Sequence, residues 1–208
     1  MKLRPCTPYS HAIQLAVRGG IVIAVIASAL LWLPATPALA GSTTCSPPAL
    51  SQPFTAWGDS NYYELVPGQV PGSFTGQGWT LSGGAQIVTD SAYSGGEVLD
   101  LPSKAEAVSP TFCVSSNYPV ARAMIRDVVG SEGVFFYVSY EGTNTWNNPQ
   151  NTGQIHGQAN SWTLSDPVNM QPSNAPGWQL VRLTFIAGGN TSDFRLYNIY
   201  VDPYSRGG

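Results

Sequence analysis

Residues 177–204 form the stretch that decides the fold, and they read GWQLVRLTFIAGGNTSDFRLYNIYVDPY. Two runs rich in β-branched and aromatic residues flank a Gly/Asn/Thr/Ser turn at 188–192, a pattern typical of a β-hairpin. In the first run three apolar side chains share one parity: Val181, Leu183 and Phe185. Arg182 and Thr184 take the other parity, so the run predicts a strand with one buried and one solvated face.

The second run changes its apolar parity part-way. Phe194 and Leu196 fall on one side, whereas Ile199 and Val201 fall on the other. One extra residue in a strand reverses the side to which the following side chains point. We therefore predict a β-bulge near residues 197–198, because it would bring both apolar pairs to the core.

The chain after residue 41 repeats short β-rich runs between turn signals. About ten such runs can be counted, including a second hairpin candidate at 79–88 and two central runs at 120–128 and 133–141. No helical apolar stripe is long enough for a βαβ unit. We predict an all-β fold with a single domain, residues 41–208, built as a two-sheet antiparallel β-sandwich of the jelly-roll kind.

Residues 1–40 have the composition of a signal peptide. An apolar run at 21–33 precedes Ala38-Leu39-Ala40, a small-x-small cleavage pattern, and follows three basic residues: Lys2, Arg4 and Arg18. The apolar run is shorter than the roughly 20 residues that a helix needs to cross a bilayer. We predict cleavage and a protein that is secreted or associated with the cell wall, with no transmembrane span left.

Charge is sparse and acidic once residues 1–40 are set aside. Three of the nine basic residues lie in that leader, which leaves six against 12 acidic residues, a formal charge of −6. Six scattered cations do not make a basic patch. Nucleic acid and anionic membrane surfaces are therefore poor partners for this chain.

Two cysteines remain after the leader, Cys45 and Cys113. An even pair in an exported chain predicts a disulfide bond. The bond would tie the Pro-rich start of the domain to a central strand. Metal binding is the alternative, although only one histidine and no third thiol accompany the pair.

Catalytic residues are hard to assemble, because His156 is the only histidine outside the leader. Gly58-Asp59-Ser60-Asn61 resembles the nucleophile block of GDSL-type esterases, in which Ser60 would attack an acyl carbon with help from a histidine. Those esterases carry Asp-x-x-His and helices around a parallel sheet, whereas Gly153 stands three residues before His156. A turn between two strands is the simpler interpretation.

A glycosidase needs two facing carboxylates about 5–10 Å apart. Glu97 and Asp100 have opposite parity on one strand, so they point to opposite faces. Acids from different strands, such as Glu64 and Glu141, leave a hydrolase open as an alternative. We predict that the protein is not an enzyme and has no catalytic residues.

Four aspartates lie at strand ends or turns, where their oxygens could converge on Ca²⁺: Asp59, Asp90, Asp193 and Asp202. Aspartate also favours turns for its own local hydrogen bonds. We predict no cofactor and no metal-binding residues, with a structural calcium ion as the alternative.

Aromatic residues offer the better functional lead, because flat rings pack on the apolar faces of sugars and amides bond sugar hydroxyls. Trp146 lies in a predicted exposed loop, 142–153, that is rich in Asn and Gln. Trp79 and Trp178 start strands and are expected to fill the core instead. We predict a ligand-binding site from these residues: Trp146, Asn144, Asn148, Trp162 and Tyr93.

Several segments also stand out as motifs: CSPP at 45–48, WGDSNYY at 57–63, GWTLSGGA at 78–85, SPTFCV at 109–114 and YVDPY at 200–204. Together they resemble a family of exported actinobacterial proteins that has no assigned activity. More loosely, the strand layout is similar to galactose-binding-like jelly rolls, the architecture of many carbohydrate-binding modules. Those modules often carry acidic and amide residues beside a structural calcium on the last strand, where residues 196–199 here read LYNI.

Three hypotheses about function follow. The first is a secreted, non-catalytic β-sandwich that binds glycan or another cell-envelope polymer. The second is an extracellular or cell-envelope structural protein that has no small ligand and interacts through a sheet face. A hydrolase, either esterase or glycosidase, is the third.

Overall fold

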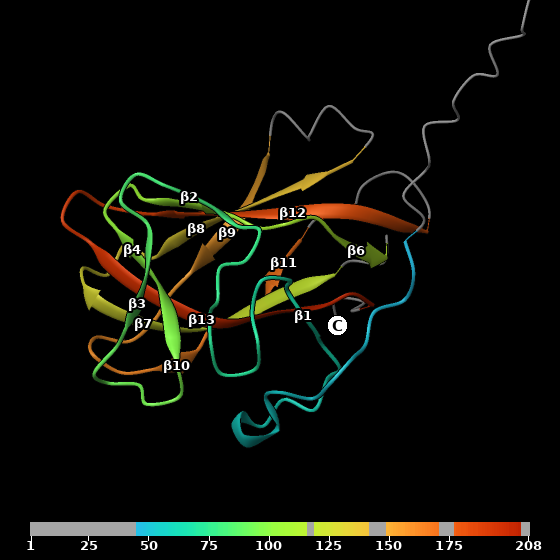
Figure 1. The fold of residues 1–208 in the computed structure, drawn as a ribbon, viewed down its shortest axis with the longest axis horizontal. Coiled ribbons are helices and arrows are strands. Elements are labelled where there is room, and N and C mark those ends of the chain that lie inside the picture. The colour runs from blue at the N-terminus through green and yellow to red at the C-terminus, as the bar shows by residue number, and fades with distance from the viewer. Residues whose placement is uncertain (1–44, 116–118, 142–148, 171–176, 205–208) are drawn as a thin grey trace, which may run out of the picture. The chain divides into compact units, whose positions relative to one another are not determined.

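Two antiparallel β-sheets stack face to face in the computed structural model (Figure 1). The structure describes residues 45–115, 119–141, 149–170 and 177–204, which all belong to one compact unit at 41–208. The only helix among these residues is the 3-10 helix η1 (Thr55–Trp57). The fold is the predicted two-sheet β-sandwich of the jelly-roll kind. Residues 1–44 lie outside the described residues, so the signal peptide stays a prediction.

One sheet has seven strands, in the order β10 (Thr163–Leu164), β7 (Val120–Val129), β13 (Asp193–Asp202), β4 (Glu97–Pro102) and β3 (Gln86–Thr89). In addition, β11 (Val168–Asn169) pairs with β7 and β1 (Glu64–Leu65) pairs with β13. The other sheet has six strands, in the order β9 (Gln150–Ile155), β8 (Val134–Tyr140), β12 (Trp178–Ala187), β5 (Glu106–Val108) and β2 (Thr80–Ser82), and β6 (Phe112–Ser115) also pairs with β12.

Several connections carry the chain from one sheet to the other, and we call four short ones crossovers. They join β2 to β3, β4 to β5, β7 to β8 and β12 to β13. The strand register places all four at the same end of the sandwich, because Asp193 pairs with both Pro102 and Val129 while Ala187 pairs with Val134. Strands that follow one another through a crossover therefore face each other across the core.

Backbone contacts hold neighbouring crossovers together. Ser103 N donates to Ser192 O at 2.8 Å, and Gly188 N donates to Gly133 O at 2.9 Å. A Cβ atom at Gly188 would lie only 2.8 Å from Gly133 O, which is closer than real Cβ atoms approach. Glycine at this position is therefore a requirement of the close packing between two crossovers.

Both predicted hairpins, at 177–201 and at 79–88, are wrong as strand pairings. The turns occur where expected, but β12 pairs with β8, β5 and β6, whereas β13 pairs with β7, β4 and β1. Likewise β2 pairs with β5 and β3 pairs with β4. Gly-rich turn residues fix a reversal of the chain, but they do not decide whether the two strands share a sheet or face each other.

The predicted bulge in β13 is confirmed. Tyr197 pairs with Met124 and Tyr200 pairs with Arg122, so β13 uses one residue more than β7 over this interval. Asn198 adopts a left-handed conformation with φ of 48°, and its side-chain oxygen accepts a hydrogen bond from Gly72 N at 2.7 Å. The bulge buries all four apolar residues that it was expected to bring inward: Phe194, Leu196, Ile199 and Val201.

The core between the sheets is aromatic near its centre. Phe185 of β12 meets Phe136 of β8 edge-to-face, with ring centroids 5.3 Å apart. Trp79 packs beside Phe185 and Phe74, and its Nε1 donates to Pro67 O at 2.7 Å. Trp79 fills the core as predicted, and its N–H has the partner that a buried indole needs. Trp178 was also expected in the core, but it is only half-buried and packs against Tyr204.

The predicted disulfide bond between Cys45 and Cys113 is confirmed, with Cα atoms 5.5 Å apart. It links the start of the described chain to β6 across a sequence separation of 68 residues. Separately, no helix within the described residues has the length and apolar character that a bilayer-crossing helix needs.

Removal of this disulfide tests its contribution to stability. The variant Cys45→Ser/Cys113→Ser is expected to lower the free energy of unfolding by about 4 kcal/mol, because the open chain regains loop entropy in the unfolded state. Urea denaturation of both proteins measures the difference, and wild type under reducing conditions is the matched control. A loss below about 1 kcal/mol would contradict this role.

Candidate functional site

The outer face of the six-stranded sheet is hollowed into a groove of about 420 Å³. Its lining residues come from β2, β5, β12, β8 and the residue just before β9: Thr80, Glu106, Val108, Tyr137, Ser139, Pro149, Arg182, Thr184 and Ile186. Strand register aligns four of them in one row, since Thr80 pairs with Val108, Val108 with Thr184 and Thr184 with Tyr137. The groove therefore runs across the strands and spans four neighbouring strands.

Side-chain size explains the hollow. Ser139 and Thr184 sit near the middle of the sheet, and both are short and buried. Longer side chains stand beside them, because Arg182 pairs with Ser139 and Tyr137 pairs with Thr184. Short residues at the floor and long residues at the walls leave a trough along the sheet surface.

The groove offers mixed polar chemistry with one flat ring. Thr80, Ser139 and Thr184 contribute hydroxyl groups, which can both donate and accept hydrogen bonds. Tyr137 contributes an aromatic ring, and Arg182 and Glu106 contribute one charge of each sign. This set suits a ligand that presents many hydroxyl groups and apolar C–H faces, and it has no net charge to select a strongly ionic one.

The predicted loop residues Trp146, Asn144 and Asn148 lie outside the described residues. Their loop connects β8 with β9, both of which belong to the six-stranded sheet, and Pro149 at its end lines the groove. The role of these three residues as ligand contacts stays a prediction.

Tyr93 and Trp162 are brought together, but on the seven-stranded sheet. Tyr93 stacks on Tyr197 of β13 at 4.1 Å between ring centroids, and Trp162 meets Tyr197 edge-on at 4.7 Å. Tyr93 Oη also donates to Gly72 O at 2.5 Å. Neither residue is among the described residues that line the groove. Their contacts pack two connecting segments against β13, and their role as ligand contacts also stays a prediction.

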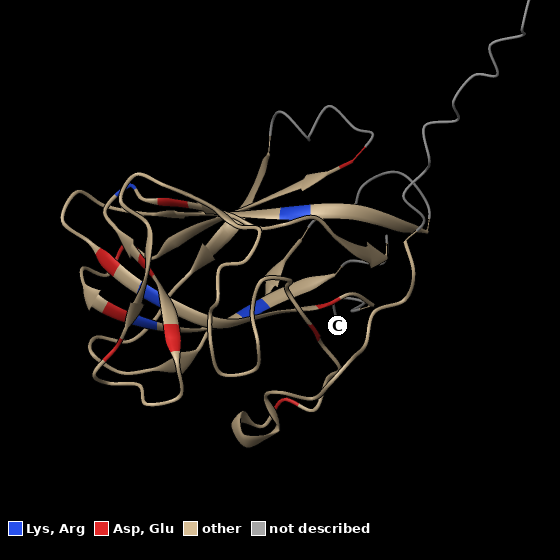
Figure 2. Ribbon diagram, viewed as in Figure 1, with Lys and Arg blue, Asp and Glu red and all other residues tan. Residues whose placement is uncertain are grey.

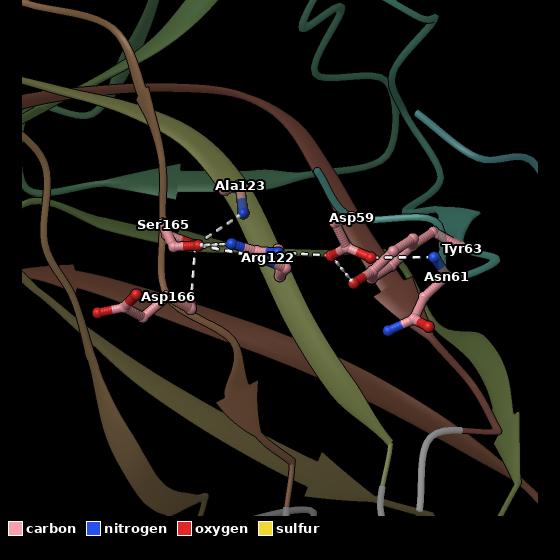
Figure 3. Close-up of polar contacts among 7 residues, drawn as sticks. All are labelled: Asp59, Asn61, Tyr63, Arg122, Ala123, Ser165 and Asp166. Carbon is pink, nitrogen blue, oxygen red and sulfur yellow. Dashed lines mark hydrogen bonds and ion pairs between the residues drawn. The ribbon is translucent and has the colours of Figure 1, made fainter. Parts of the chain in front are cut away.

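An arginine on β7 holds further segments against the same sheet. In Figure 3 the guanidinium of Arg122 lies between Asp59 and Ser165, donating to Asp59 Oδ2 at 2.5 Å and to Ser165 O at 2.7 and 2.9 Å. Burial alone would raise the pKa of Asp59, but hydrogen bonds from Tyr63 and the Asn61 amide, with Arg122, hold that pKa below its usual value. The same burial and the bond to Asp59 raise the pKa of Tyr63 to about 12.

A second ionic cluster lies on the outer face of the seven-stranded sheet, where Figure 2 shows charges gathered along β7 and β13. Asp90, whose side chain is fully buried, accepts from Arg126 at 2.5 Å and lies 3.2 Å from Arg195. Arg195 also donates to Asp100 at 3.0 Å. Burial alone would raise the pKa of Asp90, but the Ala92 amide and the two arginines hold it below its usual value.

The four aspartates considered as calcium ligands each interact with different partners. Asp59 and Asp90 bind arginines, and Asp202 Oδ1 accepts from Tyr204 N at 3.0 Å. Asp193 lies near Asp100 rather than near the other three, and burial together with Asp100 raises its pKa to about 6. Within the described residues, no three His, Cys, Asp or Glu side chains are grouped so that they could hold a metal ion.

The fold does not support the esterase hypothesis. Esterases of that type have a parallel sheet flanked by helices, whereas the pairings between named strands here are all antiparallel. Ser60 lines a cleft with Asp202 at one end of β13, and the His156 ring lies against Gly133 at the crossover end. Ten residues of β strand separate these ends by about 30 Å.

No family model and no curated protein match the sequence. Among solved structures, the chain is similar to a xylan-binding CBM22-1 domain from Paenibacillus barcinonensis, with a TM-score of 0.40, 19% identity and coverage of 60% of this chain and 85% of that one. It is similar to the xylan-binding module CBM15, with a TM-score of 0.44, 10% identity and coverage of 68% and 95%. It is also similar to SGBP-B from a xyloglucan utilization locus of Bacteroides uniformis, with a TM-score of 0.42, 11% identity and coverage of 59% and 46%. These are distant similarities of fold alone, and the match spans less than half of the last protein.

Only part of the groove lining could be identified from the sequence. Alternation placed Arg182 and Thr184 on the face away from the core, which is correct, although Thr184 is buried at the floor of the groove rather than solvated. Val108, Tyr137 and Thr80 were not recognised as their neighbours, because the row depends on the register between strands that are far apart in sequence. Only the pairing of β2, β5, β12 and β8 brings them together.

Glu64 on β1 gives the structure a pH dependence. Its Oε2 atom is buried and has no hydrogen-bond partner among the described residues. Burial raises the pKa of Glu64 to about 7. A carboxyl group with a raised pKa contributes stability that is fully present below its unfolded pKa and is lost as the pH rises through about 7.

The variant Glu64→Gln tests this dependence. It keeps the shape but cannot ionise, so we expect it to exceed wild type in unfolding free energy by about 1–3 kcal/mol at about pH 8 and to lose that advantage at about pH 5. Urea denaturation at both pH values measures the difference. Glu97→Gln, at an exposed position, is the control and should change little at either pH. An equal effect of Glu64→Gln at both pH values would refute the assignment.

Proposed function

We propose that this protein is an exported, non-catalytic glycan-binding domain whose ligand lies in the groove on the six-stranded sheet. The observation that carries the proposal is the row from Thr80 to Tyr137, which crosses four strands and places hydroxyl groups beside an aromatic ring. An extended polysaccharide presents hydroxyls and C–H faces repeatedly along its length. A groove that runs across a sheet can therefore contact several sugar units of one chain.

The absence of net charge in the groove favours a neutral glycan. Arg182 and Glu106 balance each other, and the remaining lining residues carry no charge. Glu106 is also the only carboxylate among the described residues that line the groove, whereas glycoside hydrolysis uses two. These features support binding without cleavage.

We further propose that the β8–β9 loop supplies Trp146, with Asn144 and Asn148, as an additional ring platform at this site. Support comes from Pro149, which ends the loop and lines the groove, and from the composition of the loop. Export is supported by the leader composition at 1–40 and by the disulfide, since such bonds persist in oxidising compartments.

Glycan-array screening followed by titration with the best oligosaccharide tests the proposed site. Tyr137→Ala and Trp146→Ala are each expected to weaken binding about tenfold, or about 1.4 kcal/mol, through the loss of a ring contact. Thr184→Val removes a hydroxyl while keeping a β-branched side chain, and it should cost about 1 kcal/mol. Trp57→Ala removes an exposed ring outside the groove and is the matched control.

Three outcomes decide between the hypotheses. Weakened binding in Tyr137→Ala and Thr184→Val with normal binding in Trp57→Ala supports the groove. Wild-type binding in both groove variants would remove the groove as the site. The absence of any glycan ligand on the array would overturn the function and favour a structural protein that interacts through its sheet face.

A further inference from the structure

A second hollow lies at the end of β13 that is distant from the crossovers. This cleft has a volume of about 460 Å³ and is lined by residues from the start of the described chain and from its end: Leu50, Ser60, Asn61, Tyr62, Asp202 and Tyr204. None of these residues lines the groove on the six-stranded sheet. The cleft is therefore a separate surface with its own chemistry.

Two exposed aromatic rings define the cleft. Tyr62 is 57% exposed and Tyr204 is 43% exposed, and they are two of the five large hydrophobic side chains that stand exposed among the described residues. Trp178 supports Tyr204 from behind, with the rings edge-to-face at 5.2 Å. Exposed rings that gather at one hollow, rather than being scattered singly, indicate a binding surface.

The wall that carries Tyr62 is held rigidly by its neighbours. Asp59 Oδ1 accepts from Asn61 N at 3.0 Å, and Asp59 is itself fixed by Arg122 (Figure 3). Ser51 and Tyr63 exchange two backbone hydrogen bonds, at 2.9 and 2.7 Å. A preformed wall of this kind lowers the entropy cost of binding.

The opposite wall is fixed by the end of β13. Asp202 Oδ1 accepts from Tyr204 N at 3.0 Å, which bends the chain and presents the Tyr204 ring beside the cleft. The backbone is tied to the other sheet as well, because Ser115 N of β6 donates to Pro203 O at 3.2 Å. Cys113 of β6 carries the disulfide to Cys45, five residues before Leu50. The Tyr204 wall is thus anchored on β6, and the disulfide ties the segment that leads to Leu50 to the same strand.

The chemistry of the cleft selects one class of ligand. Two rings offer flat apolar faces, and Ser60 and Asn61 offer hydroxyl and amide groups. Figure 3 shows the Asn61 side-chain amide pointing away from the Asp59–Arg122 pair. Asp202 brings a negative charge, and no lining residue among those described is a cation, so an anionic ligand would be repelled.

We propose that this cleft is a second ligand site, which takes a neutral sugar against the rings of Tyr62 and Tyr204. It goes beyond the proposed groove, because it uses different residues at the opposite end of β13 from the crossovers. Two sites on one molecule would raise its avidity for branched or densely packed glycans.

Amide chemical shifts of the protein secreted from its full-length chain provide the test, with methyl glycosides of neutral monosaccharides as probes and a uronic acid as the anionic comparison. A binding sugar should shift the resonances of Asn61, Tyr62 and Tyr204, and the uronic acid should not. Tyr62→Ala should weaken monosaccharide binding at least tenfold, whereas Tyr62→Phe, which keeps the ring, should retain most of it. Tyr62 is largely exposed, so an unchanged unfolding midpoint should accompany the loss.

The groove variant Tyr137→Ala separates the two sites. It should leave monosaccharide binding at the cleft unchanged, while Tyr62→Ala should leave oligosaccharide binding at the groove unchanged. Monosaccharide shifts confined to the groove, or unaltered binding by Tyr62→Ala, would overturn the cleft without affecting the groove. A dimer in analytical ultracentrifugation that Tyr62→Ala dissociates would also overturn the proposal, because the cleft would then hold a second copy of the protein.

Discussion

Four crossovers at one end of the sandwich form the constraint on which the rest of the structure depends. Each sends the chain into the opposite sheet, so that the two strands it joins face each other through their side chains and do not pair within one sheet. Apart from the consecutive pairs β3–β4 and β8–β9, each sheet is therefore assembled from strands that lie far apart in the chain, such as β13 with β4 and β7. Contacts of this long range make folding slow relative to helical domains of the same size. The disulfide that ties the start of the domain to β6 reduces the chain entropy of the unfolded state and so favours such long-range contacts.

The two outer faces of the sandwich differ in how far connecting segments cover them, and this difference draws attention to the groove. Connecting segments cover the outer face of the seven-stranded sheet, where Arg122, Arg126 and Arg195 bind Asp59, Asp90 and Asp100. Removal of one partner from such a buried pair leaves an uncompensated charge, which makes the covering segments hard to displace. The six-stranded sheet instead carries short polar side chains at the floor of a hollow that crosses its strands. Connecting segments thus occupy the outer face of the seven-stranded sheet, whereas the outer face of the six-stranded sheet carries the groove.

Local features of the sequence predicted most of the longer strands, the bulge and the disulfide, but β9 begins at Gln150, inside the stretch 142–153 that was predicted as a loop. Parity alone located the bulge, because Phe194 and Ile199 could share the core only with one extra residue between them. Turn chemistry could not predict the pairing, since the Gly-rich segments that close a hairpin are equally able to make a crossover. The groove depends on that pairing, so among its lining residues only Arg182 and Thr184 were placed on the outer face from sequence. Tyr93 and Trp162 were singled out by composition, and their mutual packing with Tyr197 depends on the same long-range topology.

Backbone proximity between strands, measured as nuclear Overhauser contacts in isotope-labelled protein, tests the crossover arrangement most directly. The arrangement predicts cross-strand backbone contacts between Leu183 and Val138 and between Leu196 and Ile125, which pair within the two sheets. It also predicts that Phe185 and Arg195 share none. Strong backbone contacts between Phe185 and Arg195, as a hairpin closed at residues 188–192 would produce, would contradict the stacked crossovers and remove the register that builds the groove.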